Sequence, residues 1–143
     1  MTTSQQTYTQ ELGEKYGVEW GNGVPIPITW RFWHFDVDEP NVLCTFRELI
    51  GALLWIALWT RPDIANAVRA VARYCSAPKV IHLKAARSIL GYAVRTSSFG
   101  ISFQKGTLTG LSLISFADAD YASRSTDRRS GSGGVVMLSL IHI

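Results

Sequence analysis

The chain has 143 residues, a formal net charge of +3 and a pI of about 9.1. This length suits one ordinary domain or parts of two. Hydrophobic residues make up 47% of the chain, aromatic residues 11% and charged residues only 17%, a composition that argues against intrinsic disorder. The mild basic charge permits binding to nucleic acid without demonstrating it.

Nothing in the sequence indicates secretion or a membrane anchor. Residues 1–6 are polar, unlike a signal peptide. The longest apolar run, Leu49 to Trp59, is interrupted by Gly51 and is shorter than the roughly 20 residues that a membrane span needs. Cys44 and Cys75 lack the spacing of metal ligands, and we interpret them as reduced core thiols rather than a disulfide. We therefore expect a protein that is not secreted and has no membrane partner.

Four helices are predicted in the first two thirds of the chain. Residues 4–16 suit a short helix that Gly17 ends, and an irregular connector rich in glycine and proline follows. A second helix begins near Thr45 and is apolar nearly all round, so it should lie at the centre of the fold. Proline ends one helix and starts the next, so two more helices are expected, at about 62–76 and from 79 to about 95.

After Ser97 the hydrophobic period changes to that of strands. Gly100 to Gln104 and Leu108 to Phe116 predict two strands paired around a turn at Lys105 and Gly106, and Gly133 to Leu138 predict a third strand. The sequence therefore predicts an α+β fold with three main helices, followed by the first strands of an incomplete sheet.

Two acidic residues near the end of the second predicted strand are candidates for metal binding. Asp118 and Asp120 are separated by one residue, so on a strand they point to the same face, where carboxylates can hold a divalent cation. The alternative is that Asp118 is an ordinary polar residue and that Asp120 caps the next loop. The basic turn at Arg128 and Arg129 is either a solvated loop or a contact with nucleic acid. His82 lies among apolar residues, which favours a structural role over catalysis.

Several motifs occur in a specific order along nearly the whole chain. The most specific are Phe46-Arg47-Glu48-Leu49-Ile50-Gly51-Ala52-Leu53-Leu54, Thr60-Arg61-Pro62-Asp63-Ile64-Ala65, Asp118-Ala119-Asp120-Tyr121-Ala122 and Asp127-Arg128-Arg129-Ser130. In this order the chain resembles the Pol polyprotein of copia-type LTR retrotransposons. The resemblance implies a fragment that contains the end of the reverse transcriptase and the start of ribonuclease H.

The resemblance implies four parts. Residues 1–43 would be a short helix and connector of the reverse transcriptase, residues 44–97 a thumb-like helical segment, and residues 98–137 the truncated start of an RNase H-like domain. Residues 138–143 do not continue the family pattern and resemble an in-frame translation of a sequencing adapter, so we expect them to be an artefact.

The resemblance also implies a function for the intact parent. It would copy RNA into DNA before DNA integration, and would use Mg²⁺ to cleave the RNA strand of RNA–DNA hybrids. It would act in the cytoplasm, in the virus-like particle of the transposable element, or in the nucleus. Asp118 matches the first RNase H carboxylate, with Asp120 as a second metal partner or a loop cap. Candidate contacts with a hybrid or a template–primer duplex are Arg69, Arg73, Lys84, Arg95, Arg128 and Arg129.

The chain does not contain the polymerase aspartates or most of the RNase H carboxylates of that family. We therefore expect the 143 residues to be catalytically incompetent without the missing remainder of Pol. Two other interpretations stay open: a non-catalytic helical module that binds nucleic acid, and a decayed relic of an element.

Overall fold

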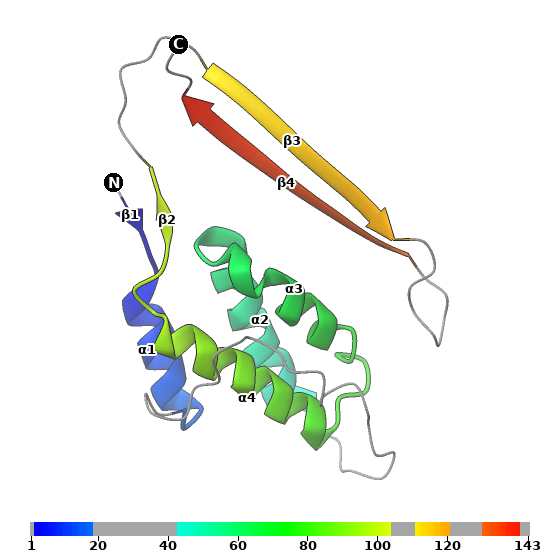
Figure 1. Cartoon of the computed structure of the whole chain (residues 1–143). Coiled ribbons are helices and arrows are strands. Elements are labelled where there is room, and N and C mark those ends of the chain that lie inside the picture. Colours follow the sequence, from blue (N-terminus) through cyan, green and yellow to red (C-terminus); the bar gives the residue numbers. More distant parts are fainter. Residues whose placement is uncertain (1, 19–42, 104–110, 121–129, 141–143) are drawn as a thin grey trace. The chain divides into compact units, whose positions relative to one another are not determined.

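The computed structural model describes residues 2–18, 43–103, 111–120 and 130–140. The chain divides into two compact units, a helical unit of residues 1–103 and a hairpin unit of residues 104–143 (Figure 1). In the described residues these units contain four α-helices and two antiparallel two-stranded sheets, which confirms the predicted α+β class.

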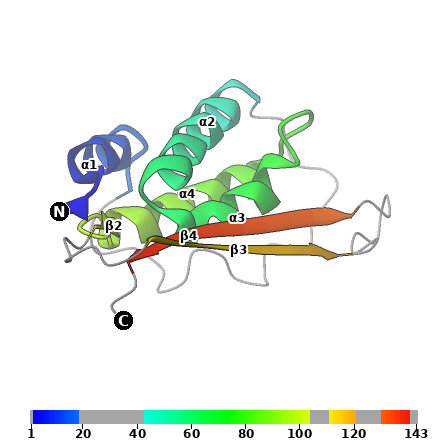
Figure 2. The ribbon, with the colours of Figure 1, turned by 90° about the horizontal axis from the view of Figure 1, so that it is seen from above.

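The helical unit is built from α1 (Gln6–Lys15), α2 (Leu43–Trp59), α3 (Pro62–Ala72) and α4 (Val80–Arg95). Helix α4 packs against the other three, and α2 also packs against α3. Figure 2 shows this group from above, with α3 and α4 side by side. The four predicted helices are confirmed, except that α3 ends at Ala72 and not near Ser76. Helix α2 begins at Leu43, so Thr45, near which its start was predicted, lies inside the helix.

The core of the helical unit is centred on one side of α2. Large side chains that are no more than 2% exposed come from α2 (Phe46, Leu49, Ile50, Leu53, Ile56), α3 (Ile64, Val68) and α4 (Ile89, Leu90). Each contributes about 1.5–3 kcal/mol through burial of apolar surface. The prediction that α2 is central holds for this side only, because several large apolar residues on its other side are exposed. Both cysteines are free, but Cys44 is exposed, so its predicted place in the core is wrong.

Glycine permits the close approach of α1 to α4. A β-carbon at Gly13 would lie only 2.8 Å from Cγ2 of Val94. Helix α1 ends at Lys15, and Gly17 just beyond it has a φ of 64°, the left-handed conformation that glycine adopts at low cost. The amide of Val18 then donates to the carbonyl of Gly13 at 2.9 Å, which closes the end of the helix.

The strand pairing differs from the predicted one. Strand β2 (Ile101–Ser102) pairs with β1 (Thr2–Thr3) and not with the strand that follows it. The reason lies at Gly100, where a β-carbon would be 2.2 Å from the carbonyl oxygen of Thr3, so only glycine lets the N-terminal strand approach. The predicted turn at Lys105 and Gly106 lies outside the described residues.

The hairpin unit contains two long strands. Strand β3 (Leu111–Asp120) pairs antiparallel with β4 (Gly131–Leu140), which includes the predicted third strand. The register places Asp118 opposite Gly133 and Asp120 opposite Gly131. The predicted pair of carboxylate residues therefore lies at the end of the ladder where β4 supplies glycines.

Candidate functional site

Asp118 is exposed near the end of β3. Its cross-strand partner Gly133 has no side chain, so no facing side chain covers the carboxylate from β4. Position 120 lies two residues further along the same strand, on the same side of the ladder. Among the residues that the structure describes, no three His, Cys, Asp or Glu side chains come together as a metal site. The described part of the chain therefore does not by itself fit a two-metal centre, and what it shows at this position is a single exposed carboxylate on β3.

The basic candidates of the helical unit form two stripes. Arg69 on α3 and Arg73 directly after it are four residues apart, so both lie on one exposed stripe. Lys84 and Arg95 are exposed on α4, three helical turns apart. Arg128 and Arg129 lie outside the described residues. The structure thus brings the helical candidates to the surface in two pairs.

A buried arginine joins the corner between α2 and α3 to the end of α4. Arg61 is only 3% exposed. Its Nε donates to Oδ1 of Asp63 at 2.9 Å and its Nη2 to Oδ2 at 2.8 Å, which is the two-pronged geometry that suits a carboxylate. The phenol of Tyr92 also donates to Oδ2 of Asp63, at 3.1 Å. Arg61, Asp63, Tyr92 and Thr96 together are called the Arg61 junction below.

The other donors of Arg61 satisfy the C-terminal end of α4. Its Nη1 donates to the carbonyl oxygen of Thr96 at 2.9 Å, and its Nη2 to Oγ1 of Thr96 at 2.6 Å. The last carbonyls of a helix lack partners within the helix and carry partial negative charge, so a cation is favourable there. The guanidinium carbon also lies 5.5 Å from the ring centre of Tyr92 and 5.7 Å from that of Phe99. Sequence reasoning used Arg61 only as part of a family motif and missed this role.

The Arg61 junction controls the ionisation of Asp63. Partial burial by itself raises the pKa of this carboxyl group. The hydrogen bonds and positive charge of Arg61, with the hydrogen bond from Tyr92, outweigh burial and hold the pKa of Asp63 below its ordinary value.

We expect acid to destabilise the helical unit through Asp63. A carboxyl group whose folded pKa lies below its unfolded pKa contributes stability above the unfolded pKa and loses it as the pH falls through the folded pKa. The free energy of unfolding should therefore decrease below about pH 4, and Asp63→Asn should flatten that decrease. Urea unfolding of both proteins between about pH 7 and about pH 2 measures how the free energy of unfolding depends on pH. Glu14→Gln, at an exposed position of α1, is the control; equal pH slopes in both variants would contradict the expectation.

His82 has a structural environment. It is 4% exposed, and its ring stacks on Tyr74 with 4.0 Å between the ring centres. Its Nδ1 accepts a hydrogen bond of 3.0 Å from the backbone amide of Lys79, which caps the start of α4. These contacts agree with the interpretation of His82 as a structural residue rather than a catalytic one.

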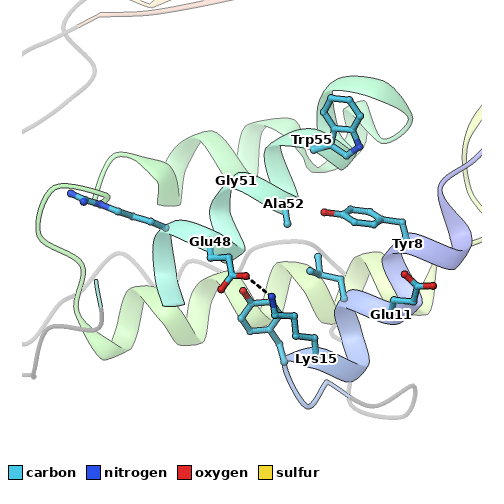
Figure 3. Close-up of a pocket in the computed structure, with 10 residues that line it drawn as sticks. Tyr8, Glu11, Lys15, Glu48, Gly51, Ala52 and Trp55 are labelled. Atoms are coloured by element: carbon cyan, nitrogen blue, oxygen red, sulfur yellow. Dashed lines mark hydrogen bonds and ion pairs between the residues drawn. The ribbon is translucent and has the colours of Figure 1, made fainter. Parts of the chain in front are cut away.

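A groove of about 440 Å³ lies between α1 and α2. Figure 3 shows Tyr8 of α1 directed toward α2, near Ala52 and Trp55. An ion pair between Lys15 and Glu48 lies at the other end of the groove. The groove therefore has an aromatic end and a charged end. Sequence reasoning did not predict it, because no periodic pattern shows where two helices diverge.

In the part of the chain that the structure describes, no helix is both long enough and apolar enough to cross a membrane. No protein-family model matches the chain, and no solved structure matches it. Over 138 residues, 94% of the chain, it is 36% identical to the retrovirus-related Pol polyprotein from transposon RE2 of Arabidopsis thaliana. The chain belongs to the copia-type, retrovirus-related Pol polyproteins. The resemblance seen in the sequence motifs is thereby confirmed.

Other relatives show how this Pol segment is placed in longer and shorter chains. It is 38% identical over 93 residues to the Pol polyprotein from transposon RE1 of Arabidopsis thaliana. The chain spans only 6% of the RE1 polyprotein and 9% of the RE2 polyprotein. It is also 33% identical over 95 residues to secreted RxLR effector protein 161 of Plasmopara viticola, of which the match covers 65%. Most of each polyprotein thus lies outside the region that this Pol segment matches.

Proposed function

We propose that this Pol segment is the junction at which the end of a reverse transcriptase passes into the start of a ribonuclease H. The observation that carries the proposal is the 36% identity to the RE2 polyprotein over 138 residues, a stretch that includes residues of both units. The intact parent then performs RNA-directed DNA synthesis and cleaves the RNA of RNA–DNA hybrids, in a cytoplasmic particle or in the nucleus.

The helical unit is proposed to hold the nucleic-acid duplex. Arg69 and Arg73 form one exposed cationic stripe, and Lys84 and Arg95 form a second. Cations at helical spacing can contact successive phosphates, and such contacts position a duplex without reading its sequence. The buried Arg61 takes no part in this contact, because its donors are used inside the fold.

The hairpin unit is proposed to supply one carboxylate to the nuclease centre. Asp118 would be a ligand of Mg²⁺, which activates a water molecule and stabilises the leaving oxygen in such centres. Asp120 would assist as a second partner or cap the following loop. The remaining carboxylates must come from outside the described residues, because those residues assemble no group of three. The 143 residues alone are therefore proposed to lack cleavage activity.

We expect duplex binding by the 143-residue chain to depend steeply on salt. Each phosphate contact releases counterions, so the double variant Arg69→Gln/Arg73→Gln should reduce the slope of log affinity against log salt by about 2. Fluorescence anisotropy with a labelled RNA–DNA hybrid measures this slope.

The matched control for this titration is Lys15→Gln. Lys15 is also an exposed cation, but it lies on α1 and is paired with Glu48. The Lys15→Gln variant should therefore have the same slope of log affinity against log salt as the unchanged chain. Binding without salt dependence, or equal effects of the two variants, would contradict the proposed interface.

A second candidate function is a helical module that binds nucleic acid without chemistry. The match to the effector protein favours a module that stands by itself, because the 95 aligned residues account for 65% of that shorter protein. The exposed cations Arg69, Arg73, Lys84 and Arg95 are what favour nucleic acid as its ligand. The two functions differ in what they require of Asp118. A binding module does not need this carboxylate, whereas a ribonuclease H centre does.

A further inference from the structure

Helix α2 is apolar on two sides, and the described residues of the helical unit bury only one of them. On the other side Leu54, Trp55, Leu58 and Trp59 are 45%, 50%, 77% and 55% exposed. The rings of Trp55 and Trp59 contact each other, with 5.4 Å between their centres. A helix that is apolar all round is normally buried all round, and a contiguous exposed apolar patch usually marks an interaction site.

The exposed side of α2 continues into the groove beside α1. Trp55 belongs both to the patch and to the groove, and Tyr8 of α1, 39% exposed, lines the groove opposite it (Figure 3). Gly51 also lines the groove, and a β-carbon added there would meet no atom within 4 Å. The patch and the aromatic end of the groove are called the outer α2 surface below.

We propose that the outer α2 surface binds an apolar segment of the same Pol polyprotein that lies outside these 143 residues. The chain spans 9% of the RE2 polyprotein, so most of the polyprotein is available as a covalently attached partner. Covalent linkage gives such a partner a high effective concentration, on the order of millimolar for short flexible linkers.

The chemistry of the surface fits an apolar partner rather than a phosphate backbone. Tryptophan and tyrosine are the residues that most often dominate binding energy at protein interfaces. The charged groups Lys15 and Glu48 pair with each other at the far end of the groove. The aromatic end of the groove therefore offers a partner an apolar surface of defined shape and no unpaired charge from Lys15 or Glu48. The proposal rests on membership of the Pol polyproteins and not on the nucleic-acid role of the helical unit.

Photo-crosslinking in the complete Pol polyprotein tests the proposed contact. A photoreactive phenylalanine derivative replaces Leu58, which is 77% exposed, and the matched control replaces Thr45, an exposed residue of the same helix. We expect position 58, and not position 45, to crosslink to a Pol segment outside the 143 residues. Crosslinks from position 58 that fall within the 143 residues or on a second polyprotein copy, or no crosslinks at all, would overturn the proposal.

A pair of substitutions at Gly51 gives a second measurement. Gly51→Ala and Gly51→Arg both replace a helix-weakening glycine by a good helix former, so both should raise the Tm of the 143-residue chain. Only arginine is large enough to obstruct the groove. In the complete polyprotein, Gly51→Arg alone should increase hydrogen exchange of the segment crosslinked to position 58. Equal hydrogen exchange of that segment in Gly51→Ala and Gly51→Arg would overturn the proposal. Unchanged hybrid binding in both variants would show that the outer α2 surface does not take part in the proposed nucleic-acid contact.

Discussion

Replacement of Arg61 by alanine is expected to lower the free energy of unfolding of the helical unit by about 3 kcal/mol. The substitution removes a buried guanidinium that binds Asp63, the carbonyl of Thr96 and the hydroxyl of Thr96. Loss of one partner of a buried ion pair typically costs about 3–5 kcal/mol. The lower end applies here because the side chain of Asp63 is 38% exposed and water can partly replace its lost partner.

Urea unfolding followed by circular dichroism measures this loss. Arg61→Lys should recover only part of the stability, because an ammonium group cannot make the two-pronged contact with Asp63 while also reaching the end of α4. Arg69→Ala, at an exposed position of α3, is the control and should change stability by no more than about 0.5 kcal/mol. Similar effects of Arg61→Ala and Arg69→Ala would show that the Arg61 junction does not stabilise the fold.

Replacement of Asp118 by asparagine in the complete Pol polyprotein is expected to reduce cleavage of RNA in RNA–DNA hybrids by at least about 100-fold. Loss of a residue that only supports a metal ligand typically costs about 10–100-fold, and loss of a proposed ligand should cost more. Asparagine keeps the size of the side chain but removes the charge that would attract Mg²⁺. Release of labelled RNA fragments from a hybrid in the presence of Mg²⁺ measures the rate.

Two controls separate the loss of chemistry from loss of folding or binding. Ser115→Asn changes an exposed residue on the opposite side of the same strand and should keep full activity. Hybrid affinity of the Asp118→Asn polyprotein should stay within about twofold, since the proposed phosphate contacts lie on the helical unit. Normal cleavage by Asp118→Asn would show that this segment supplies no ligand to the nuclease centre and would leave nucleic-acid binding as its role.

Local sequence patterns predicted the helices and the inner side of α2 correctly. Pro62 stands at the start of α3 because proline lacks an amide hydrogen that the first turn does not need. The apolar positions Phe46, Leu49 and Leu53 keep helical spacing and are all fully buried. These features depend on residues close in sequence, so a periodic pattern is enough to predict them.

The parts that sequence reasoning missed depend on contacts between distant residues. The hydroxyls of Thr2 and Ser102, which face each other across β1 and β2 at 3.1 Å, are 100 residues apart in the chain. Arg61 binds the carbonyl of Thr96 across 35 residues. Neither Thr2 nor Arg61 has a local pattern that distinguishes it from an ordinary surface residue. The exposed outer side of α2 was missed for the same reason, because an apolar pattern does not reveal whether a partner is present.

The pairing of β1 with β2 has a mechanical consequence. Thr3 lies opposite Ile101, so the first and last strands described in the helical unit run antiparallel at the spacing of neighbouring strands, about 4.8 Å. A pulling force applied to the backbone on either side of the unit would act on this two-residue ladder before it reached the helices. The two ends of the helical unit are thus hydrogen-bonded to each other through β1 and β2. Stretching of the surrounding polyprotein would first separate Thr2–Thr3 from Ile101–Ser102, while the core around Phe46 stayed packed.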